Sequence, residues 1–123
     1  MQNKNMYQAI FDTVAVHLLT QNKPSVSKMS NKCMYRSDEG LKCAIGCLIP
    51  DEKYSPAFEG RTISGHGATT MLPDAYKNAD LNFLTELQHL HDCRIPSSWK
   101  KELYYFASQH GLSPASAVQF QRV

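Results

Sequence analysis

The stretch that decides the fold is Asn5-Met6-Tyr7-Gln8-Ala9-Ile10-Phe11-Asp12-Thr13-Val14-Ala15-Val16-His17-Leu18-Leu19-Thr20. Its apolar residues recur at helical spacing along one side: Met6, Tyr7, Ile10, Phe11, Val14 and Leu18. Asn5 suits an amino-terminal cap, and Asn22-Lys23-Pro24 is a stop signal. The pattern predicts an amphipathic helix over residues 5–20 that buries this side against the rest of the chain.

The carboxyl-terminal part of the chain repeats the helical pattern. Asp80 is placed to cap a helix over residues 81–92, whose inward-facing residues are Leu84, Leu87 and Leu90. Pro96-Ser97 opens another helix over residues 98–110, with four large side chains along one side: Trp99, Leu103, Phe106 and His110. Gly111-Leu112 suits a left-handed helix stop, and Ser113-Pro114 begins a short final helix.

The middle of the chain is predicted to be mostly irregular. Residues 21–32 are polar and predict a surface loop, and residues 61–71 predict a mobile loop. Two short segments, 33–36 and 41–43, flank Ser37-Asp38-Glu39-Gly40, which suits a type I turn followed by a residue with positive φ. We therefore expect a β-hairpin that brings the first cysteine of this region, Cys33, close to Cys43.

Two short helical turns are expected after the hairpin. Residues 44–49 form an unbroken apolar run that ends at Pro50; in a helix, Cys43 and Cys47 would share a face and Gly46 would permit a close backbone contact. Residues 55–60 combine a serine cap, a proline at the first helical position and a terminal glycine.

The fold class that follows is mainly α (α+β). A chain of 123 residues fits a single domain over residues 1–123, and we expect about four to five helices with one short β-hairpin near residues 33–43. Apolar residues make up 42% of the chain and charged residues 20%, a balance typical of a globular protein.

Composition and charge exclude several classes of function. The sequence holds no run of 18 apolar residues and begins without a recognisable secretory signal, so we expect no membrane span and a reducing cytoplasm in which the cysteines are thiols or metal ligands. The net charge is only +2, which makes nucleic acid an unfavoured partner. Basic residues along the first loop and hairpin are expected to keep this region solvated: Lys23, Lys28, Lys32, Arg36 and Lys42.

The cysteines leave three interpretations open. Cys33, Cys43 and Cys47 could hold a metal ion, although the usual pair of closely spaced cysteine pairs is missing. Cys43 at a helix start could be a nucleophile, with His66 or His91 nominated as its base. The interpretation we favour is that the thiols are buried packing residues, because unpaired cysteine is among the most buried residue types. We accordingly predict no catalytic residue, no metal and no cofactor.

Two nearby histidines, His89 and His91, resemble a metal pair in sequence. Residues two apart on a helix point in nearly opposite directions, so one ion could not bind both of them. We interpret them as imidazoles that favour the carboxyl end of a helix.

Polar and aromatic residues around the hairpin form the candidate binding site. Asp51, Glu52 and Glu59 supply acidic groups, and aromatic rings from the same region accompany them. The predicted binding residues are Tyr35, Arg36, Asp51, Glu52, Tyr54 and Glu59.

The segment Lys42-Cys43-Ala44-Ile45-Gly46-Cys47-Leu48-Ile49-Pro50-Asp51-Glu52-Lys53-Tyr54, continued by Phe58-Glu59-Gly60, resembles a family of small uncharacterised phage and prophage proteins. The resemblance extends to Cys33-Met34-Tyr35-Arg36, to Gly40 and to Leu87-Gln88-His89-Leu90-His91-Asp92, and so covers about residues 6–110. The family has no established biochemical activity. What the resemblance implies is a phage-related origin and a bacterial host cytoplasm.

These observations favour a non-enzymatic accessory protein that binds a host protein, for example in counter-defence or host takeover. Two alternatives stay open: a small enzyme or ligand-sequestering protein with a pocket around Cys43, Tyr35 and Glu52, and a metal-binding protein. The sequence also leaves association into a homo-oligomer open.

Overall fold

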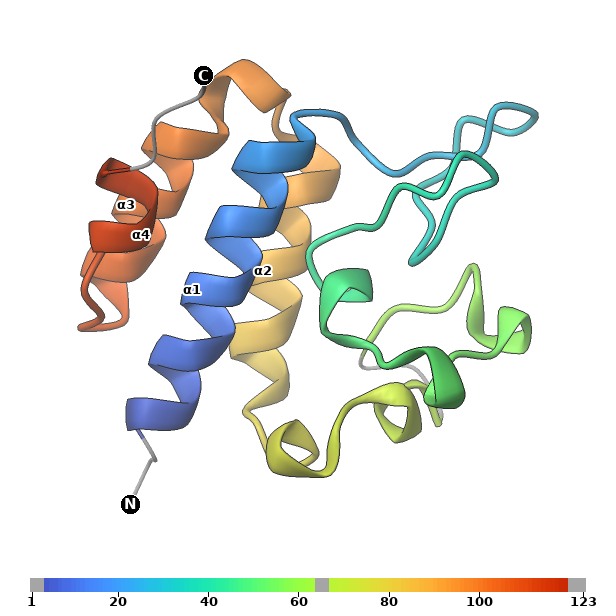
Figure 1. Ribbon diagram of the computed structural model, residues 1–123, viewed down its shortest axis with the longest axis horizontal. Coiled ribbons are helices and arrows are strands. Elements are labelled where there is room, and N and C mark those ends of the chain that lie inside the picture. Colours follow the sequence, from blue (N-terminus) through green and yellow to red (C-terminus); the bar gives the residue numbers. More distant parts are fainter. Residues whose placement is uncertain (1–3, 64–66, 120–123) are drawn as a thin grey trace.

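Four α-helices form one half of the molecule and an irregular segment forms the other (Figure 1). The helices are α1 (Lys4–Gln21), α2 (Leu81–Cys93), α3 (Trp99–Gln109) and α4 (Ala115–Val118). The computed structural model describes residues 4–63 and 67–119. The fold is mainly helical, as the sequence predicts.

Helix α1 lies between the two halves and contacts both. It packs on α3 and α4 on one side and on the short helix Gly46–Leu48 on the other. Its inward face is fully or almost fully buried: Tyr7, Ile10, Phe11, Val14, Ala15, Leu18 and Leu19. Asn22 ends the helix with a positive φ of 54° while its N–H donates to the carbonyl of Leu18 (2.8 Å). The predicted helix and its stop are both confirmed.

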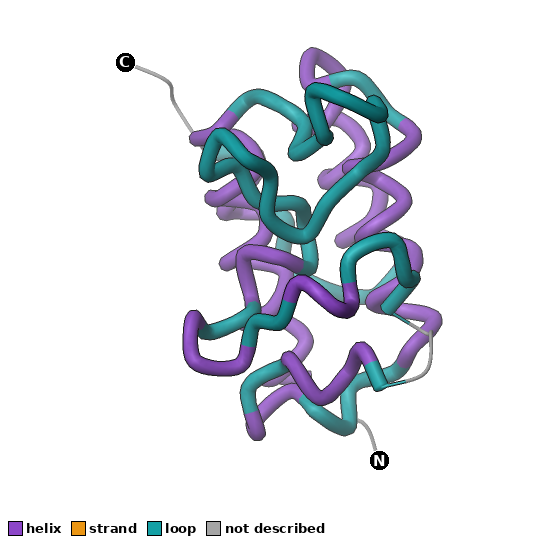
Figure 2. Tube along the Cα trace, turned by 90° about the vertical axis from the view of Figure 1, so that its right-hand side faces the viewer, coloured by secondary structure: helices purple, strands orange, loops and turns teal. Residues whose placement is uncertain are grey.

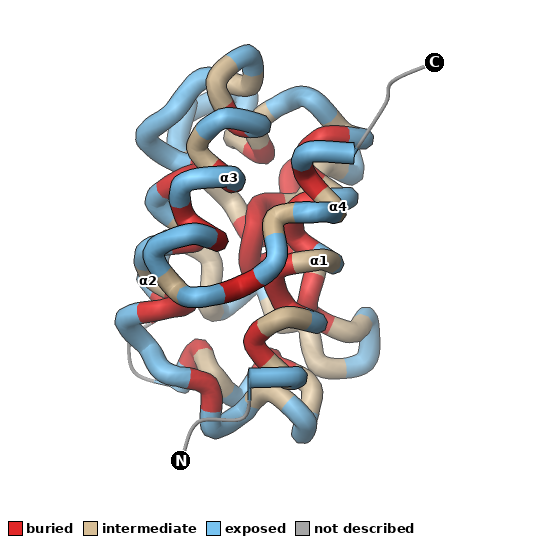
Figure 3. Tube along the Cα trace, turned by 90° about the vertical axis from the view of Figure 1, so that its left-hand side faces the viewer, coloured by how far each residue is buried: buried red, intermediate tan, exposed pale blue. Residues whose placement is uncertain are grey.

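The carboxyl-terminal helices follow the predicted caps. The Asp80 carboxylate accepts the N–H of Asn82 (2.7 Å) at the start of α2. A single 3-10 turn, Pro96–Ser98, leads into α3. Gly111 has a φ of 67°, and the N–H of Leu112 returns to the carbonyl of Ala107 (2.8 Å), which closes the helix with the expected apolar contact. Figure 3 shows how α3 and α4 turn their buried residues inward.

The segment between α1 and α2 contains five short 3-10 helices joined by turns (Figure 2). They are Gly46–Leu48, Asp51–Lys53, Pro56–Phe58, Ala68–Met71 and Asp74–Tyr76. The predicted turn at Ser55 is confirmed, because its side chain accepts the N–H of Ala57. The apolar side chains of this half join those of α1, α2 and α3 in one core cluster.

The predicted hairpin is reduced to a turn with isolated bridges. Gly40 has the expected positive φ of 82°, but over residues 4–63 and 67–119 the structure contains only two antiparallel bridges, Val26 with Cys33 and Arg36 with Lys42, and no strand. The reason is that side chains, described below, take the backbone groups that a ladder would use. Cys33 therefore faces Val26 in a bridge rather than Cys43.

Gly46 lies directly against the backbone carbonyl of Tyr35. A Cβ at this position would overlap that oxygen, so only glycine fits. The N–H of Cys47 donates to the carbonyl of Cys43 (3.1 Å), so one helical turn relates the two thiols as predicted. The close approach expected at Gly46 is confirmed.

Both long loops contain residues that the sequence does not predict to be buried. In the first, Ser25 is fully buried, although serines in a polar segment are usually solvent-exposed. In the second, Ile63 is buried and residues 68–71 form a 3-10 helix whose Ala68 and Met71 are buried. Residues 64–66 of that loop, which include His66, lie outside the described residues.

The length and hydropathy of the helices determine whether any of them could cross a bilayer. Among the residues that the structure describes, none of them combines the length and the apolar character that crossing a membrane requires.

Candidate functional site

The carboxylate of Glu59 organises the region that the sequence predicts to bind a partner. One oxygen accepts the backbone N–H of Tyr35 (2.9 Å). The other accepts the N–H of Arg36 (3.0 Å) and the hydroxyl of Tyr54 (2.6 Å). The first of these bonds takes the N–H that Tyr35 would donate across a β-ladder, and together the bonds tie residues 54 and 59 to the chain before the turn. We call Glu59, Tyr35, Arg36, Tyr54 and Asp51 the Glu59 network.

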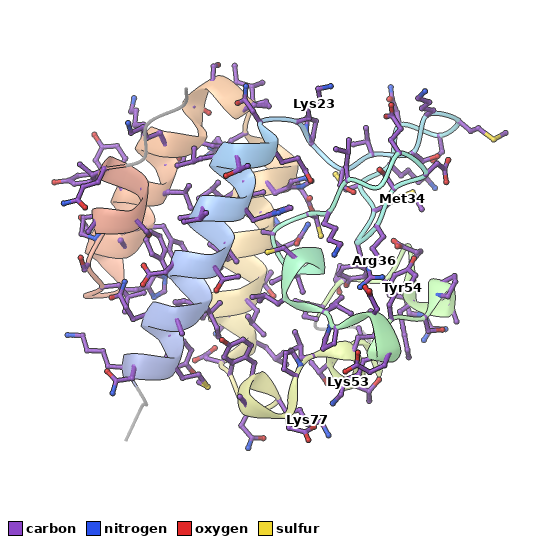
Figure 4. All side chains as sticks on the ribbon, viewed as in Figure 1. Lys23, Met34, Arg36, Lys53, Tyr54 and Lys77 are labelled. Atoms are coloured by element: carbon purple, nitrogen blue, oxygen red, sulfur yellow. The ribbon has the colours of Figure 1, made fainter. Side chains whose placement is uncertain are left out.

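Arg36 connects this network to the surface. Its guanidinium lies over the ring of Tyr54, 4.5 Å from the centroid, and donates to the carbonyl of Ile49 (2.9 Å). The same group pairs with Asp51 (2.8 Å), whose side chain is 87% exposed. Figure 4 shows Arg36 and Tyr54 pointing toward each other. The carboxylate of Asp51 therefore lies at the surface, next to the guanidinium of Arg36.

The structure connects five of the six predicted binding residues. The sixth, Glu52, is exposed on the short helix Asp51–Lys53, next to Asp51. Tyr35 is buried, and its hydroxyl donates to the carbonyl of Arg61 (2.6 Å). Burial raises the pKa of Tyr54 to about 12, and its hydrogen bond to Glu59 acts in the same direction. Tyr54 therefore remains a proton donor to Glu59 at neutral pH.

A second polar cluster, which the sequence does not predict, surrounds the buried ring of His91. Its Nε2 accepts the backbone N–H of Ser25 (2.9 Å), and its Nδ1 lies 2.8 Å from the carboxylate of Asp92. Because a backbone N–H can only donate, the ring proton must sit on Nδ1 and point at Asp92. The ring also stacks on Trp99, with 5.6 Å between centroids. We call Ser25, His91, Asp92 and Cys33 the His91 cluster.

Asp92 accepts hydrogen bonds from three side chains. Burial alone would raise the pKa of this carboxyl group, but bonds from His91, Cys33 and Gln88 outweigh it and lower the pKa. The Asp92 side chain remains 29% exposed. It is a carboxylate at neutral pH and fixes both the ring of His91 and the thiol of Cys33.

Cys33, His91 and Asp92 have ligand atoms within 4.8 Å of one another, and within residues 4–63 and 67–119 they form the only such group of three. The group does not fit a metal ion, however. A metal on Nδ1 of His91 would move the proton to Nε2, where it would meet the N–H of Ser25. Cys43 and Cys47 are not part of this group, so the three cysteines of the metal-binding alternative, Cys33, Cys43 and Cys47, are not brought together.

Three of the four thiols are held in their protonated form. Burial raises the pKa of Cys33, of Cys43 and of Cys47 to about 12. Cys43 is fully buried and its sulfur accepts the N–H of Gly46 (3.2 Å). His91, one of the two bases nominated for Cys43, has both ring nitrogens engaged elsewhere. A nucleophilic thiolate at Cys43 is therefore disfavoured.

A cavity of about 290 Å³ lies between the Glu59 network and the His91 cluster. Both Cys33 and Cys43 reach its wall, as do Tyr35, Glu59 and Asp92. Its position agrees with the predicted pocket around Cys43 and Tyr35, except that Glu59 takes the place of Glu52. The volume is at the small end of the range for ligand sites, roughly 300–1,000 Å³.

Sequence reasoning missed the partners of His91, and it missed Met29. The partners of His91 are Ser25, 66 residues earlier, and Trp99 across a turn, and no periodicity connects them. Met29 is 95% exposed at the tip of the first loop. A signal for Met29 was present, because it is a large apolar residue alone in a polar segment.

The chain was compared with known protein families, curated proteins and solved structures. It matches no family model, no curated protein and no solved structure.

Proposed function

We propose that this chain is a non-enzymatic accessory protein that binds another protein through the irregular half of the molecule. The observation that carries the proposal is the Glu59 network, which fixes an irregular surface without placing a reactive group on it. A surface that is ordered before binding loses little conformational entropy when a partner arrives. The bonds of Glu59 thus favour recognition by shape and charge.

The polar groups of this half support a binding role over a catalytic one. Tyr35 and Arg36 donate their backbone N–H groups to Glu59, and the thiol of Cys43 is buried and un-ionised at neutral pH. Next to the Glu59 network, the carboxylates of Asp51 and Glu52 are exposed on neighbouring residues of one short helix. We assign to this pair the outer contact with the partner.

The partner's origin follows from the sequence resemblance to phage proteins and is part of the proposal. On that basis the chain acts in the cytoplasm of a bacterial host and binds a host protein. The interaction would serve host takeover or evasion of host defence.

Affinity capture from bacterial lysate with a charge-reversed variant tests this function. Wild-type protein should recover one stoichiometric partner, and Asp51→Lys combined with Glu52→Lys should lose it. Lys101→Glu is the matched control, because Lys101 is an exposed charge on α3, away from the irregular half. Recovery of chaperones alone would contradict the proposal. Circular dichroism on each variant verifies that it is folded.

A second candidate function is sequestration of a small ligand in the cavity. Its support is the cavity volume of about 290 Å³ and the wall of thiol, phenol and carboxylate groups. Native mass spectrometry of protein purified from bacterial cells should then detect a co-purified small molecule. Thr85→Phe, which places a ring at the cavity wall, should remove it. A spectrum of bare protein from wild type would argue against this candidate.

A further inference from the structure

The turn between Ser27 and Lys32 carries the most exposed large apolar side chain among the described residues, Met29. This loop projects from the irregular half at the upper right of Figure 1. A thioether side chain adapts to irregular apolar surfaces, and methionine is used at protein-binding surfaces for that reason. Such a residue at the tip of a projection is suited to enter a pocket on another molecule.

Hydrogen bonds within the turn fix its shape. The hydroxyl of Ser27 accepts the N–H groups of Met29 (3.2 Å) and Ser30 (3.3 Å). The backbone of Ser27 bonds to Lys32 and to Asn31, 2.8 Å in each case, and Asn31 adopts a φ of 62°. Met29 is thus presented on a pre-formed turn, which lowers the entropic cost of binding.

The base of the loop is anchored in the core. Ser25 donates its N–H to His91 and its hydroxyl to the carbonyls of Met34 (2.7 Å) and Leu41 (3.1 Å). Val26 and Cys33 then close the loop with an antiparallel bridge. The tip therefore has a fixed position relative to α2 and to the Glu59 network.

Positive charge surrounds the tip. Lys23, Lys28 and Lys32 lie in this loop, and the sequence contains no acidic residue from position 13 to position 37. Two exposed acidic residues, Asp38 and Glu39, follow on the next turn, and Glu39 lies 3.5 Å from Lys28 in an exposed pair of the kind that contributes little. A complementary surface would be apolar at its centre and acidic at its rim.

We propose that Met29 anchors the interface and inserts into an apolar pocket with an acidic rim on the partner protein. This inference rests on the proposed function. Full burial of a methionine side chain corresponds to roughly 10- to 150-fold in affinity. The lysines accelerate and orient the encounter, so binding weakens as salt is added.

A protein pocket fits this tip better than a lipid surface does. One apolar side chain at the end of a narrow turn gives little insertion into a bilayer, where amphipathic segments bury a whole face. Binding to vesicles containing phosphatidylserine, lost in Met29→Ala, would overturn the assignment in favour of a membrane.

Photo-crosslinking in bacterial cells locates the interface. We place benzoylphenylalanine at position 29, at position 52 and, as a control, at Ser108, which is exposed on α3. The expected result is a crosslink from position 29 to one protein, at an apolar site flanked by Asp or Glu residues. A crosslink from position 52 without one from position 29 would refute the Met29 anchor while leaving the proposed function intact. No crosslink to another protein from any position would refute both.

Affinity for the crosslinked protein provides the second readout. Met29→Ala should weaken binding by roughly 10- to 150-fold and Met29→Leu, which keeps the apolar volume, by less than about 5-fold. Lys28→Glu combined with Lys32→Glu should slow association and flatten the salt dependence. An unchanged affinity in Met29→Ala, or crosslinks from position 29 to a second copy of this chain, would overturn the inference.

Discussion

The imidazole of His91 accepts the backbone N–H of Ser25 across 66 residues of sequence, with 2.9 Å between the two nitrogens. This bond joins the first loop to the carboxyl end of α2, and Asp92 sets the ring tautomer that makes it available. Together with the bond from the Cys33 thiol to Asp92, it holds the loop that carries Met29 on the helical half.

Replacing His91 with Phe should destabilise the fold by about 2–4 kcal/mol. The variant leaves the buried N–H of Ser25 without an acceptor, a loss of about 1–3 kcal/mol, and removes one of three donors from Asp92, a further loss of about 1 kcal/mol. Urea unfolding followed by Trp99 fluorescence measures the change. His89→Phe is the matched control, since His89 is exposed two residues earlier, and it should stay within about 0.5 kcal/mol of wild type. Equal effects of the two substitutions would contradict the assigned role of His91.

Replacing Gly46 with Ala should destabilise by about 3 kcal/mol or more, because the added Cβ would overlap the carbonyl oxygen of Tyr35 and force the two segments apart. Gly60→Ala is the comparison. Gly60 has a φ of 84° but open space around it, so only backbone strain of about 1 kcal/mol is expected. The urea midpoints of the two variants distinguish a packing clash from backbone strain. If the Gly46 variant is as stable as the Gly60 variant, the close approach at Gly46 is disproved.

Glu59→Gln should cost about 2–3 kcal/mol. In the wild type, two N–H groups and one O–H group donate to the two carboxylate oxygens. The amide of the variant keeps one acceptor oxygen but points its NH₂ group, itself a donor, at the remaining donors. Tyr54→Phe removes one of these donors and should cost about 1–2 kcal/mol. A double-mutant cycle measures the coupling between the two side chains, which should be clearly above zero. Strict additivity would show that the hydroxyl and the carboxylate do not interact.

Stability should fall as the pH drops below about 6.5, the ordinary pKa of histidine, and His17 should account for part of this fall. Burial of the ring lowers the pKa of His17, while its hydrogen bond to the carbonyl of Lys42 acts in the opposite direction. Just below pH 6.5, His17 binds a proton more readily in the unfolded chain than in the folded protein. The free energy of unfolding therefore decreases toward acidic pH. His17→Gln should show a smaller decrease between pH 7 and pH 5. Identical slopes in the two proteins would contradict the lowered pKa.

Thiol labelling should separate the cysteines into two classes. With pKa values near 12, only about one in ten thousand of the thiols of Cys33, Cys43 and Cys47 is ionised at pH 8. Cys93 is exposed and should react with iodoacetamide first. Peptide mass spectrometry identifies the labelled residue, and Cys93→Ser should abolish the fast phase. Rapid labelling of Cys43 in the folded protein would revive the nucleophile interpretation.

The helices could be predicted because their signals are local. The spacing of apolar residues in α1, the Asp80 cap and the Gly111 stop each lie within one element, and all three are confirmed. The turn before Gly40 was predictable for the same reason. The missing ladder beside it was not, since Glu59, which takes the N–H of Tyr35, lies 24 residues away in sequence.

The sequence could suggest which residues belong to the candidate site, but not how hydrogen bonds connect them. Sequence placed Tyr35, Arg36, Tyr54 and Glu59 in one candidate set, yet it could not show that the carboxylate lies inside and bonds to backbone N–H groups. For His91 the sequence misled, because histidine near a helix end is usually solvated. Its burial depends on a stacking partner, Trp99, that belongs to a different helix.

The backbone bonds of the Glu59 network also bear on how the protein behaves at high concentration. A chain edge with free N–H and C=O groups is a template on which further copies can add as strands. Here Glu59 occupies the N–H groups of Tyr35 and Arg36, and Ser25 occupies the carbonyls of Met34 and Leu41. The apolar run that follows, residues 44–49, is thereby flanked by a segment that is hard to recruit into fibrils. Loss of the Glu59 carboxylate would expose that template and should promote aggregation as well as unfolding.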